Sequence, residues 1–450
     1  MTFKPKLTFS QIINMNVGFF GIQYSFGLQQ TAVNPLFTFL HAKPEELPIL
    51  NLAGPITGLL IQPLIGALSD KTWHPRWGRR KPYFLIGAIG CSLCLFLFPF
   101  SSALWMAVGL LWLLDASNNT AMEPYRAFIA DKLPEEQRAT GFLTQSFFTG
   151  LGITLANLSL YFFQKIITGE TKTDTGESGI PYWVFGSFFV GAFCSIASVL
   201  WSVSKTPEIP PTEAELKHLR ESKKGIFEPV IEIFAAIKDM PATLWQLALV
   251  YLFQWYAMFC YWQFISLSLA KSIWHTTAED NKELYGEAVG WTGLVNGWYN
   301  IVTFLSAFAL VGLAKKYSAK SVHMGCLAMA CIALIILPHI ENKWFVFIPM
   351  IGFGIAWASM MGVPYIMVVN SIPKERYGVY MGIVNMMIVV PMILQNISFR
   401  YVYEYVLAGN PNNAIMFAGV LLGLAALATL RIKVTKVNDE DIGMPVGGGH

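Results

Sequence analysis

Long uninterrupted apolar runs are the feature that most restricts how this chain can fold. Residues 344–369 contain no charged side chain, and several other runs approach that length. About 20 consecutive apolar residues span the hydrocarbon core of a bilayer. Only 13% of the 450 residues are charged, whereas about a quarter are charged in soluble proteins. The runs therefore predict a protein with many membrane-spanning helices.

The distribution of basic residues predicts the number and the orientation of the spans. With the N-terminus in the cytoplasm, seven of the 31 lysines and arginines fall on the outer side, which leaves 24 on the cytoplasmic side. An excess of lysine and arginine on that side sets the orientation of membrane proteins. Turning the chain over, or removing one span, destroys this asymmetry. We therefore predict an all-α membrane protein with both termini in the cytoplasm and twelve spans, at residues 12–38, 48–69, 83–103, 104–129, 141–166, 181–203, 242–270, 289–313, 321–340, 343–370, 378–402 and 412–431.

A long polar segment at residues 204–241 divides the spans into six and six. Pro210 and Pro211 prevent the sixth span from continuing, because proline breaks a helix interior. The TEAELKHLRES run that follows is typical of a short surface helix. The predicted organisation is an N-terminal six-helix bundle at 1–203, a cytoplasmic linker at 204–241, a C-terminal six-helix bundle at 242–432 and a cytoplasmic tail at 433–450.

A short motif near the end of the fourth span returns near the end of the tenth. Pro124-Tyr125 is followed by ADKLPEEQRATGF, and Pro364-Tyr365 by VNSIPKERYGVYMG. The alternative is a chance similarity between two membrane loops. Parallel repeats of six spans are the architecture of major facilitator carriers, whose substrate site lies at the midplane between the halves.

The loop after the second span carries an acidic helix end beside a basic cluster. Asp70 closes the GALSD segment, and Arg79 and Arg80 lie in the KTWHPRWGRRKP segment that follows. Such charges could form a cytoplasmic latch between neighbouring helices, or could simply anchor the loop in the cytoplasm. The spacing resembles the signature loop of the major facilitator superfamily, which favours the latch.

The fourth span holds the ionisable residues that anchoring does not explain. Asp115, Glu123 and Arg126 lie inside it, and Asp115 is near the midplane, about 16 Å from the outer end. Asp115, Asn119 and Arg126 fall on one side of the helix, with Asn118 at its edge. Such a polar stripe must face the bundle interior or water, never lipid.

We predict different roles for these charges. Glu123 and Arg126 are three residues apart and can pair as a cytoplasmic gate. Asp115 has no cation within one helical turn. Burial disfavours the charged form of such a carboxyl group, so Asp115 can load and release a proton as access alternates. It donates a hydrogen bond only when protonated, a difference that a sugar hydroxyl can detect. The alternative is a structural role in helix packing.

Uncharged polar and aromatic residues in other spans suit a neutral polyol. Amides offer paired hydrogen bonds, and aromatic rings offer a surface for the CH face of a sugar. Packing or interfacial anchoring is the alternative for each aromatic side chain. The predicted sugar-binding residues are Gln23, Tyr24, Asp115, Asn118, Asn119, Trp255, Asn296 and Asn385.

Three segments resemble the plant sucrose–proton symporters and their bacterial relatives, within the glycoside–pentoside–hexuronide:cation symporter group. They are GIQYSFGLQQ, NLAGPITGLLIQPLIGALSDKTWHPRWGRRKPYF and WLLDASNNTAMEPYRAFIAD. The resemblance is strong over the first 140 residues and thinner in the second half, where GIVNMMIVVPMIL resembles the eleventh span. It implies that Asp115 is the protonatable residue that also meets the sugar. It also implies roles for Arg126, for Asn118 and Asn119, and for Gln23.

The sequence departs from the plant proteins at three places. Glu123 stands where they have a glycine, and Met392 where they have a glutamine. Their Arg-Glu pair after the seventh span is replaced by LAKSIWHTT. We therefore expect a proton-coupled symporter for a small sugar, either sucrose or, as the bacterial branch suggests, maltose or another α-glucoside. We expect it to act as a monomer in the cell membrane, either the inner or the plasma membrane, with no cofactor and no nucleic-acid partner.

Other functions fit the residues less well. Sodium coupling, as in melibiose carriers, relies on carboxylates within the second span, which has none before Asp70. A sugar sensor would carry an added cytoplasmic domain, and an enzyme would need a second catalytic group near Asp115. Cys91 and Cys94 form a CxxC, which indicates redox chemistry in soluble proteins but small filler side chains within a membrane helix. The histidines lack metal-ligand spacing, so we expect no metal site.

Overall fold

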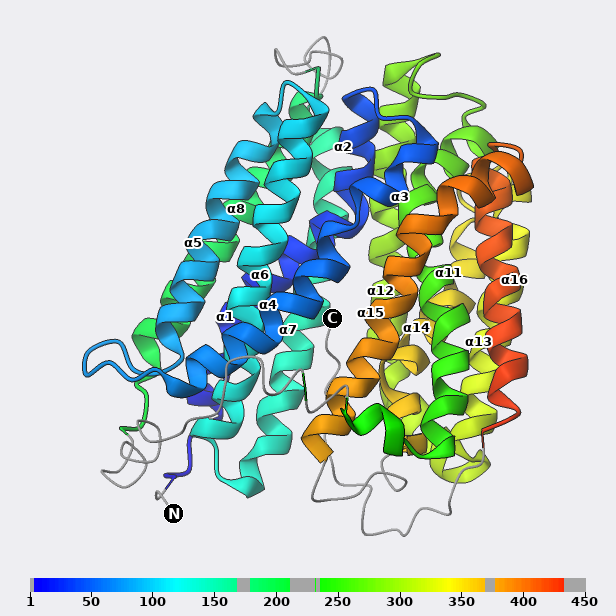
Figure 1. The fold of residues 1–450 in the computed structure, drawn as a ribbon. Coiled ribbons are helices and arrows are strands. Elements are labelled where there is room, and N and C mark those ends of the chain that lie inside the picture. The colour runs from blue at the N-terminus through cyan, green and yellow to red at the C-terminus, as the bar shows by residue number, and fades with distance from the viewer. Residues whose placement is uncertain (1–3, 168–178, 211–230, 232–234, 369–376, 433–450) are drawn as a thin grey trace.

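The computed structural model describes most of the chain, namely residues 4–167, 179–210, 231, 235–368 and 377–432. Within these ranges the chain is helical, and the only extended pairing is a bridge between His74 and Gly78 in the loop after the second span. Twelve long helical segments run roughly side by side in two bundles (Figure 1).

Each bundle contributes six of these segments. The N-terminal bundle consists of α1 (Phe9–Leu28), the π-helix η1 (Gln29–Val33), α2 (Asn34–Phe39), α3 (Leu47–Leu50), α4 (Ala53–Lys71), α5 (Lys81–Leu97), α6 (Leu104–Lys132), α7 (Glu135–Ile166) and α8 (Tyr182–Lys205). The C-terminal bundle consists of α11 (Ala242–Ile273), α12 (Lys282–Tyr317), α13 (Ala319–Ile336), α14 (Phe347–Val368), α15 (Tyr377–Tyr401), the π-helix η9 (Val402–Val406) and α16 (Pro411–Thr429). The predicted fold class is therefore confirmed.

The predicted spans match these helices, with differences at their ends. The first span is not one continuous α-helix, because η1 interrupts it, and α3 and α4 share the second. α7 and α12 are longer than the predicted spans at 141–166 and 289–313, since both continue beyond the apolar segment. The surface helix predicted for the TEAELKHLRES run, and most of the predicted linker and tail, fall outside the described residues.

Hydropathy alone identifies eight spans among the described residues. The four helices that fall short are α1, α6, α11 and α12. These helices carry a large share of the amides, the aromatic side chains and Asp115. The helices that look least like membrane spans are therefore those that turn polar groups toward the protein interior.

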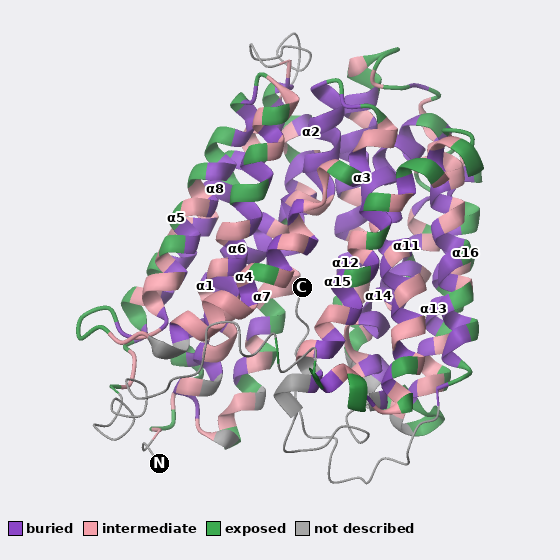
Figure 2. Ribbon diagram, in the orientation of Figure 1, coloured by how far each residue is buried: buried purple, intermediate pink, exposed green. Residues whose placement is uncertain are grey.

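The outer faces of the bundles are apolar, as a protein surrounded by lipid requires. Trp105, Phe193 and Leu427 leave 78%, 70% and 62% of their surface exposed. Figure 2 shows buried residues concentrated between the helices and exposed ones on the outward sides. A surface of this kind would be an interaction or aggregation site in water, and it is the normal surface of a membrane protein in a bilayer.

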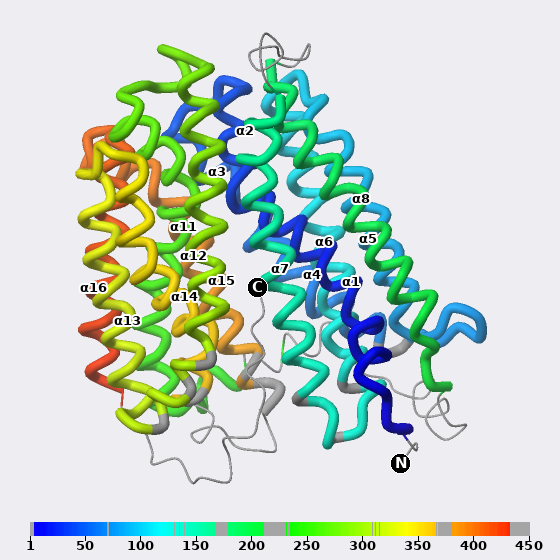
Figure 3. Tube along the Cα trace, turned by 180° about the vertical axis from the view of Figure 1, so that it is seen from behind, coloured from blue at the N-terminus to red at the C-terminus, as the bar shows by residue number. Residues whose placement is uncertain are grey.

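The two bundles touch mainly at the outer end, opposite the N-terminus. There the Phe39 ring packs against Tyr285 at 5.5 Å between ring centroids, and Lys282 Nζ donates to the Gly179 carbonyl oxygen at 3.1 Å. Toward the cytoplasm the described bundles share few contacts, such as the Phe147–Phe304 ring pair at 6.1 Å. Figures 1 and 3 show the bundles leaning together at the end of α2 and α3 and standing apart at the other. The arrangement is therefore inward-facing.

Glycines on α12 allow this close approach of the bundles. A Cβ at Gly293 would lie 2.5 Å from the Asn157 carbonyl oxygen on α7, and one at Gly297 would lie 2.6 Å from Leu158 Cδ2. Neither distance leaves room for a methyl group. The outer contact between α7 and α12 therefore depends on residues without side chains.

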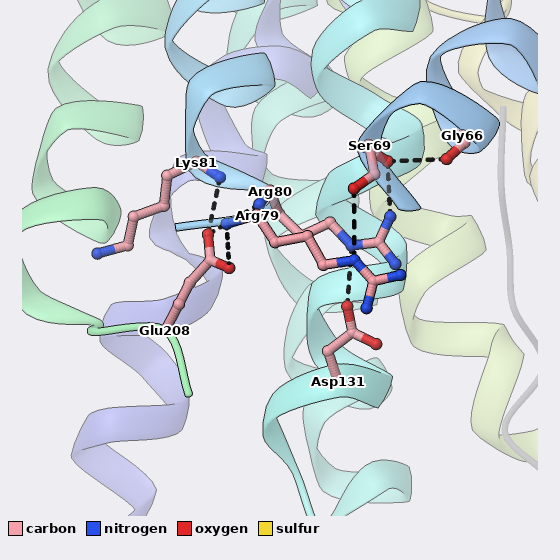
Figure 4. Close-up of polar contacts among 7 residues, drawn as sticks. All are labelled: Gly66, Ser69, Arg79, Arg80, Lys81, Asp131 and Glu208. Atoms are coloured by element: carbon pink, nitrogen blue, oxygen red, sulfur yellow. Dashed lines mark hydrogen bonds and ion pairs between the residues drawn. The ribbon is translucent and has the colours of Figure 1, made fainter. Parts of the chain in front are cut away.

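A group of hydrogen bonds holds the cytoplasmic end of the N-terminal bundle (Figure 4). The Glu208 carboxylate, just after α8, accepts from three successive backbone N–H groups of Arg79, Arg80 and Lys81, at 2.7, 2.9 and 2.9 Å. These groups lie at the start of α5, where N–H groups lack helical partners and the helix dipole favours a negative charge. Arg80 Nε also donates to Asp131 Oδ2 at 2.8 Å. We call Glu208, Arg79, Arg80, Lys81 and Asp131 the cytoplasmic clasp.

We expect Gly293→Leu to force α7 and α12 apart and open the outer end. Overpacking typically costs about 1–3 kcal/mol, which shifts a two-state equilibrium by roughly tenfold or more. A cysteine at Tyr285, in a chain without its other cysteines, should then react faster with a membrane-impermeant thiol reagent. Gly109→Leu is the matched control, because a Cβ at Gly109 meets nothing within 4 Å. Equal labelling of the two variants would contradict the assignment.

We expect Glu208→Ala to lower the stability by about 1–2 kcal/mol, because three N–H groups at the start of α5 lose their acceptor. Glu208→Gln, which keeps an acceptor oxygen, should lose less. The melting temperature in detergent measures both. Glu136→Ala is the control: its pair with Lys6 leaves both side chains about 70% exposed, and exposed pairs contribute about 0–1 kcal/mol. A Glu208→Ala melting temperature no lower than that of the control would refute this role.

Candidate functional site

A cavity lies between the two bundles, near the middle of the helices. It has about 1000 Å³ of empty space, including the part that is continuous with solvent. Eight amide side chains line it, namely Gln29, Gln30, Asn34, Asn51, Gln62, Asn119, Gln263 and Asn385. Five aromatic side chains line it as well, namely Phe26, Trp255, Phe259, Trp262 and Trp357. The lining thus combines neutral polar amides with a large aromatic surface.

Asp115 is the only ionisable side chain among the described residues that line this cavity. It lies on α6 and is 3% exposed. α4 passes close to it, since a Cβ at Gly54 would lie 3.7 Å from Asp115 Oδ2. In the described part of the chain no lysine or arginine pairs with Asp115. The carboxyl group is therefore buried without a counter-ion.

Asn119, one turn after Asp115, ties this helix to α4. Its Nδ2 donates to the Asp115 carbonyl oxygen at 2.9 Å and to Thr57 Oγ1 at 3.2 Å. Its Oδ1 accepts from Gln62 Nε2 at 2.7 Å. Buried polar groups are costly unless they are paired in this way. The network fixes α4 against α6 on the side that carries Asp115.

The π-helix η1 forms part of the cavity wall. π-helical turns are rare and often occur at functional sites. Gln29 and Gln30 at its start line the cavity, whereas Thr31 is buried in the contact between the bundles and accepts from Asn296 Nδ2 at 2.9 Å. The irregular turn therefore serves the cavity and the bundle interface within three residues.

Three tryptophans form the wall on the C-terminal side. Trp357 on α14 packs edge to face against Trp255 and Trp262 on α11, with ring centroids 5.8 and 5.4 Å apart. Trp262 Nε1 donates to the Tyr299 hydroxyl at 3.4 Å. Aromatic pairs prefer such T-shaped contacts. These contacts hold the three rings together on the side of the cavity that faces the bundle carrying Asp115.

The structure brings half of the predicted sugar-binding residues to the cavity and places the others elsewhere. Asp115, Asn119, Trp255 and Asn385 line the cavity. The other four residues, Gln23, Tyr24, Asn118 and Asn296, are buried and are not part of its lining. Direct contact of those four with a sugar stays a prediction from the sequence.

Asn296 bonds to Thr31 in the contact between the bundles, and helix packing accounts for the positions of the other three residues. Asn118 donates to Ser25 Oγ at 2.9 Å and accepts from Cys91 Sγ at 2.8 Å, which fixes α6 to α1 and α5. Gln23 lies behind Met122, with Nε2 4.0 Å from Sδ. Tyr24 packs where α8 passes at Gly191.

The predicted gate residues do not form one cluster. Glu123 and Arg126 pair at 3.8 Å, with Arg126 Nη2 also 3.3 Å from Met122 Sδ on the cytoplasmic side of the cavity. Arg79 and Arg80 belong to the cytoplasmic clasp, whose acids Asp131 and Glu208 the sequence reading missed. The side chain of Asp70 lies outside the described residues.

Trp357, Asn51 and Gln62 are cavity residues that sequence reasoning missed. Trp357 lies in an apolar run with no polar neighbour, so nothing in the sequence separates it from a lipid-facing tryptophan. Gln62 lies seven residues after Pro55, which also lines the cavity, and this helical spacing was a usable signal. Met392 lines the cavity too, so the departure from the plant sequences at this position falls within the candidate site.

Two other kinds of site can be compared with the structure, a metal site and a redox-active cysteine pair. No three histidine, cysteine or acidic side chains among them lie together as a metal site would require. All six cysteines are free, and Cys91 and Cys94 are 0% and 6% exposed within α5. The predicted filler role of the CxxC agrees with this burial.

Comparison with known proteins agrees with the fold. A sucrose transport protein of Arabidopsis thaliana (SUC4) is 24% identical over 463 residues, which cover 92% of this chain and 89% of that protein. The crystal structure of a D-xylose-proton symporter superposes with a TM-score of 0.64 at 16% identity, and covers 97% of this chain and 99% of that one. The nucleoside transporter NupG superposes with a TM-score of 0.67 at 16% identity, over 94% of this chain and 99% of that one.

The sequence model of the Major Facilitator Superfamily matches residues 15–395. This stretch includes most of both bundles and every residue that lines the cavity. The chain is therefore a multi-pass membrane transport protein, not an enzyme, and it belongs to the Major Facilitator Superfamily.

Proposed function

We propose that this carrier imports a neutral sugar of disaccharide size together with protons, by alternating access. The observation that carries the proposal is Asp115, the single ionisable side chain among the described residues of a cavity otherwise lined by amides, aromatic rings and small or apolar residues. The similarity of the chain to sucrose transport proteins supports a sugar as the substrate.

The chemistry of the lining fits a sugar. Amides both donate and accept hydrogen bonds, as sugar hydroxyls do. The tryptophan wall offers flat apolar area for the CH face of a pyranose ring, and sites of this kind combine aromatic surface with a few placed polar groups.

The position of Asp115 supports proton coupling. A buried charge without a counter-ion is costly, and here the cost falls when the carboxylate binds a proton. The protonated group can donate a hydrogen bond to a sugar, and the ionised group can only accept. Binding of the sugar and binding of the proton are then linked through one side chain. Opening to the cytoplasm exposes both to water, where they leave.

Proteoliposomes test the proposal directly. Adding sucrose or maltose outside should alkalinise the external medium while sugar enters, and replacing sodium with choline should leave the rate unchanged. Uptake that needs sodium would replace protons with sodium as the coupling ion. No ion movement and no uptake with either sugar or with related glycosides would refute the proposed function.

Asp115→Asn should abolish accumulation. Asparagine keeps the shape of the side chain and can still form hydrogen bonds, but it does not take up a proton at physiological pH. The sugar concentration inside the vesicles should therefore rise no higher than the concentration outside. Exchange of labelled for unlabelled sugar should continue, because it needs no net proton transfer. Both quantities, uptake driven by a proton gradient and exchange without a gradient, are measured in the same preparation. Full gradient-driven accumulation by the variant would rule out proton coupling through Asp115.

Trp357→Ala should weaken sugar binding by about tenfold, since it removes a stacking surface and the edge contacts that hold Trp255 and Trp262. Trp357→Phe should retain part of the affinity. Titration of sugar into purified protein gives the dissociation constants. Trp245→Ala, which removes a tryptophan that is 55% exposed on the outer face of α11, is the control. Equal affinity for the two alanine variants would contradict a sugar-facing Trp357.

A further inference from the structure

Four residues form a directed chain of hydrogen bonds from α15 to the N-terminal bundle. Gln395 Nε2 donates to Gln263 Oε1 at 2.8 Å, and Gln263 Nε2 donates to Asn396 Oδ1 at 2.8 Å. Asn396 Nδ2 then donates to the backbone carbonyl oxygen of Asn51 at 3.3 Å. The three amide side chains are at most 2% exposed. Buried amides held on both sides have a fixed orientation.

Gln263 is the residue in this series of hydrogen bonds whose orientation can affect a bound sugar. It lines the cavity, whereas Gln395 and Asn396 do not. An amide offers two N–H donors and two lone pairs on its oxygen. The bonds to Asn396 and Gln395 take one of each, which leaves Gln263 one donor and one acceptor. This is the pair that a sugar hydroxyl, itself both donor and acceptor, requires.

The last bond of the chain crosses between the bundles. Asn396 lies on α15, and Asn51 lies in the turn between α3 and α4 at the outer end. When the outer end opens, these segments must separate and the bond must break. Asn396 then loses the contact that fixes its Nδ2, and its hold on Gln263 weakens with it.

We propose that Asn396 is a positioning residue that orients Gln263 toward the sugar, and that it does so only while the outer end is closed. The inference rests on the proposed function. A ligand shifts an equilibrium only by its differential affinity for the two states. If a sugar binds more tightly when Gln263 is oriented, its binding favours closure of the outer end. This closure is the step that must follow the binding of sugar from outside.

A double-mutant cycle tests this coupling, with sucrose and maltose as probes. Gln263→Ala should raise the dissociation constant about fivefold, the effect of losing one net hydrogen bond. Asn396→Ala should raise it nearly as much. The double variant should match Gln263→Ala alone, because an absent side chain needs no positioning. If Asn396 were merely structural, the two effects would multiply.

The controls separate positioning from folding. Asn16→Ala removes another buried amide, one that bonds only within its own helix, to the Ile12 carbonyl oxygen at 2.8 Å, and it should leave the affinity unchanged. Melting temperatures report the stability of every variant. Gln395→Met, which removes the other partner of Gln263, provides a second cycle if Asn396→Ala does not fold.

A conformational measurement completes the test. Sugar should slow thiol labelling of the Tyr285→Cys carrier that lacks its other cysteines, and adding Asn396→Ala should remove most of this protection. Multiplying effects in the cycle, or undiminished protection in Asn396→Ala, would overturn the inference while leaving sugar transport standing. If the unchanged carrier binds neither sugar, the proposed function fails first and this inference fails with it.

Discussion

The inability of lipid to form hydrogen bonds is the constraint on which this structure depends. Every backbone group within the bilayer must be satisfied inside the protein, which leaves helices as the spanning elements. Polar side chains must then turn toward the interior, and those that line the cavity come from η1, α2, α4, α6, α11 and α15 and from the turn before α4. The cavity is where their faces meet. The site is thus a direct consequence of sorting polar groups away from lipid.

The contact between the bundles is built to be broken. Outside the cavity it consists of ring contacts, glycines that permit close approach, the bond from Lys282 to the Gly179 carbonyl oxygen, and single neutral hydrogen bonds such as Asn296 to Thr31 and Asn396 to Asn51. Each such bond contributes only about 1 kcal/mol net. The strong charge-assisted bonds of the cytoplasmic clasp lie within one bundle instead. A carrier that alternates access needs stable bundles and a weak interface between them. The stronger bonds lie within a bundle and the weaker ones between the bundles, as this requires.

Resemblance to the sucrose symporters and the geometry of the site meet at a few positions. Asp115 lies in the cavity, as the role implied by the resemblance requires, and so does Met392, where the plant proteins carry a glutamine. Glu123, the other departure, pairs with Arg126 toward the cytoplasm and does not line the cavity. Of these two departures, the one at Met392 therefore falls within the candidate site and the one at Glu123 falls outside it.

The sequence by itself determined the membrane-spanning helices and predicted that Asp115 lies in the interior, because hydropathy and an isolated carboxyl group in an apolar run are properties of local stretches. It could not decide which amides share a site. Asn118 and Asn119 are neighbours in sequence, yet a rotation of about 100° sends one to Ser25 and the other to the cavity. Asn51, Gln263 and Asn396 are far apart in the chain and meet only because α3 and α15 pack together. Trp357 carries no signal in its apolar run. Those pairings depend on how helices rotate and cross, which is set by side-chain packing over the whole molecule, and only the tertiary structure fixes them.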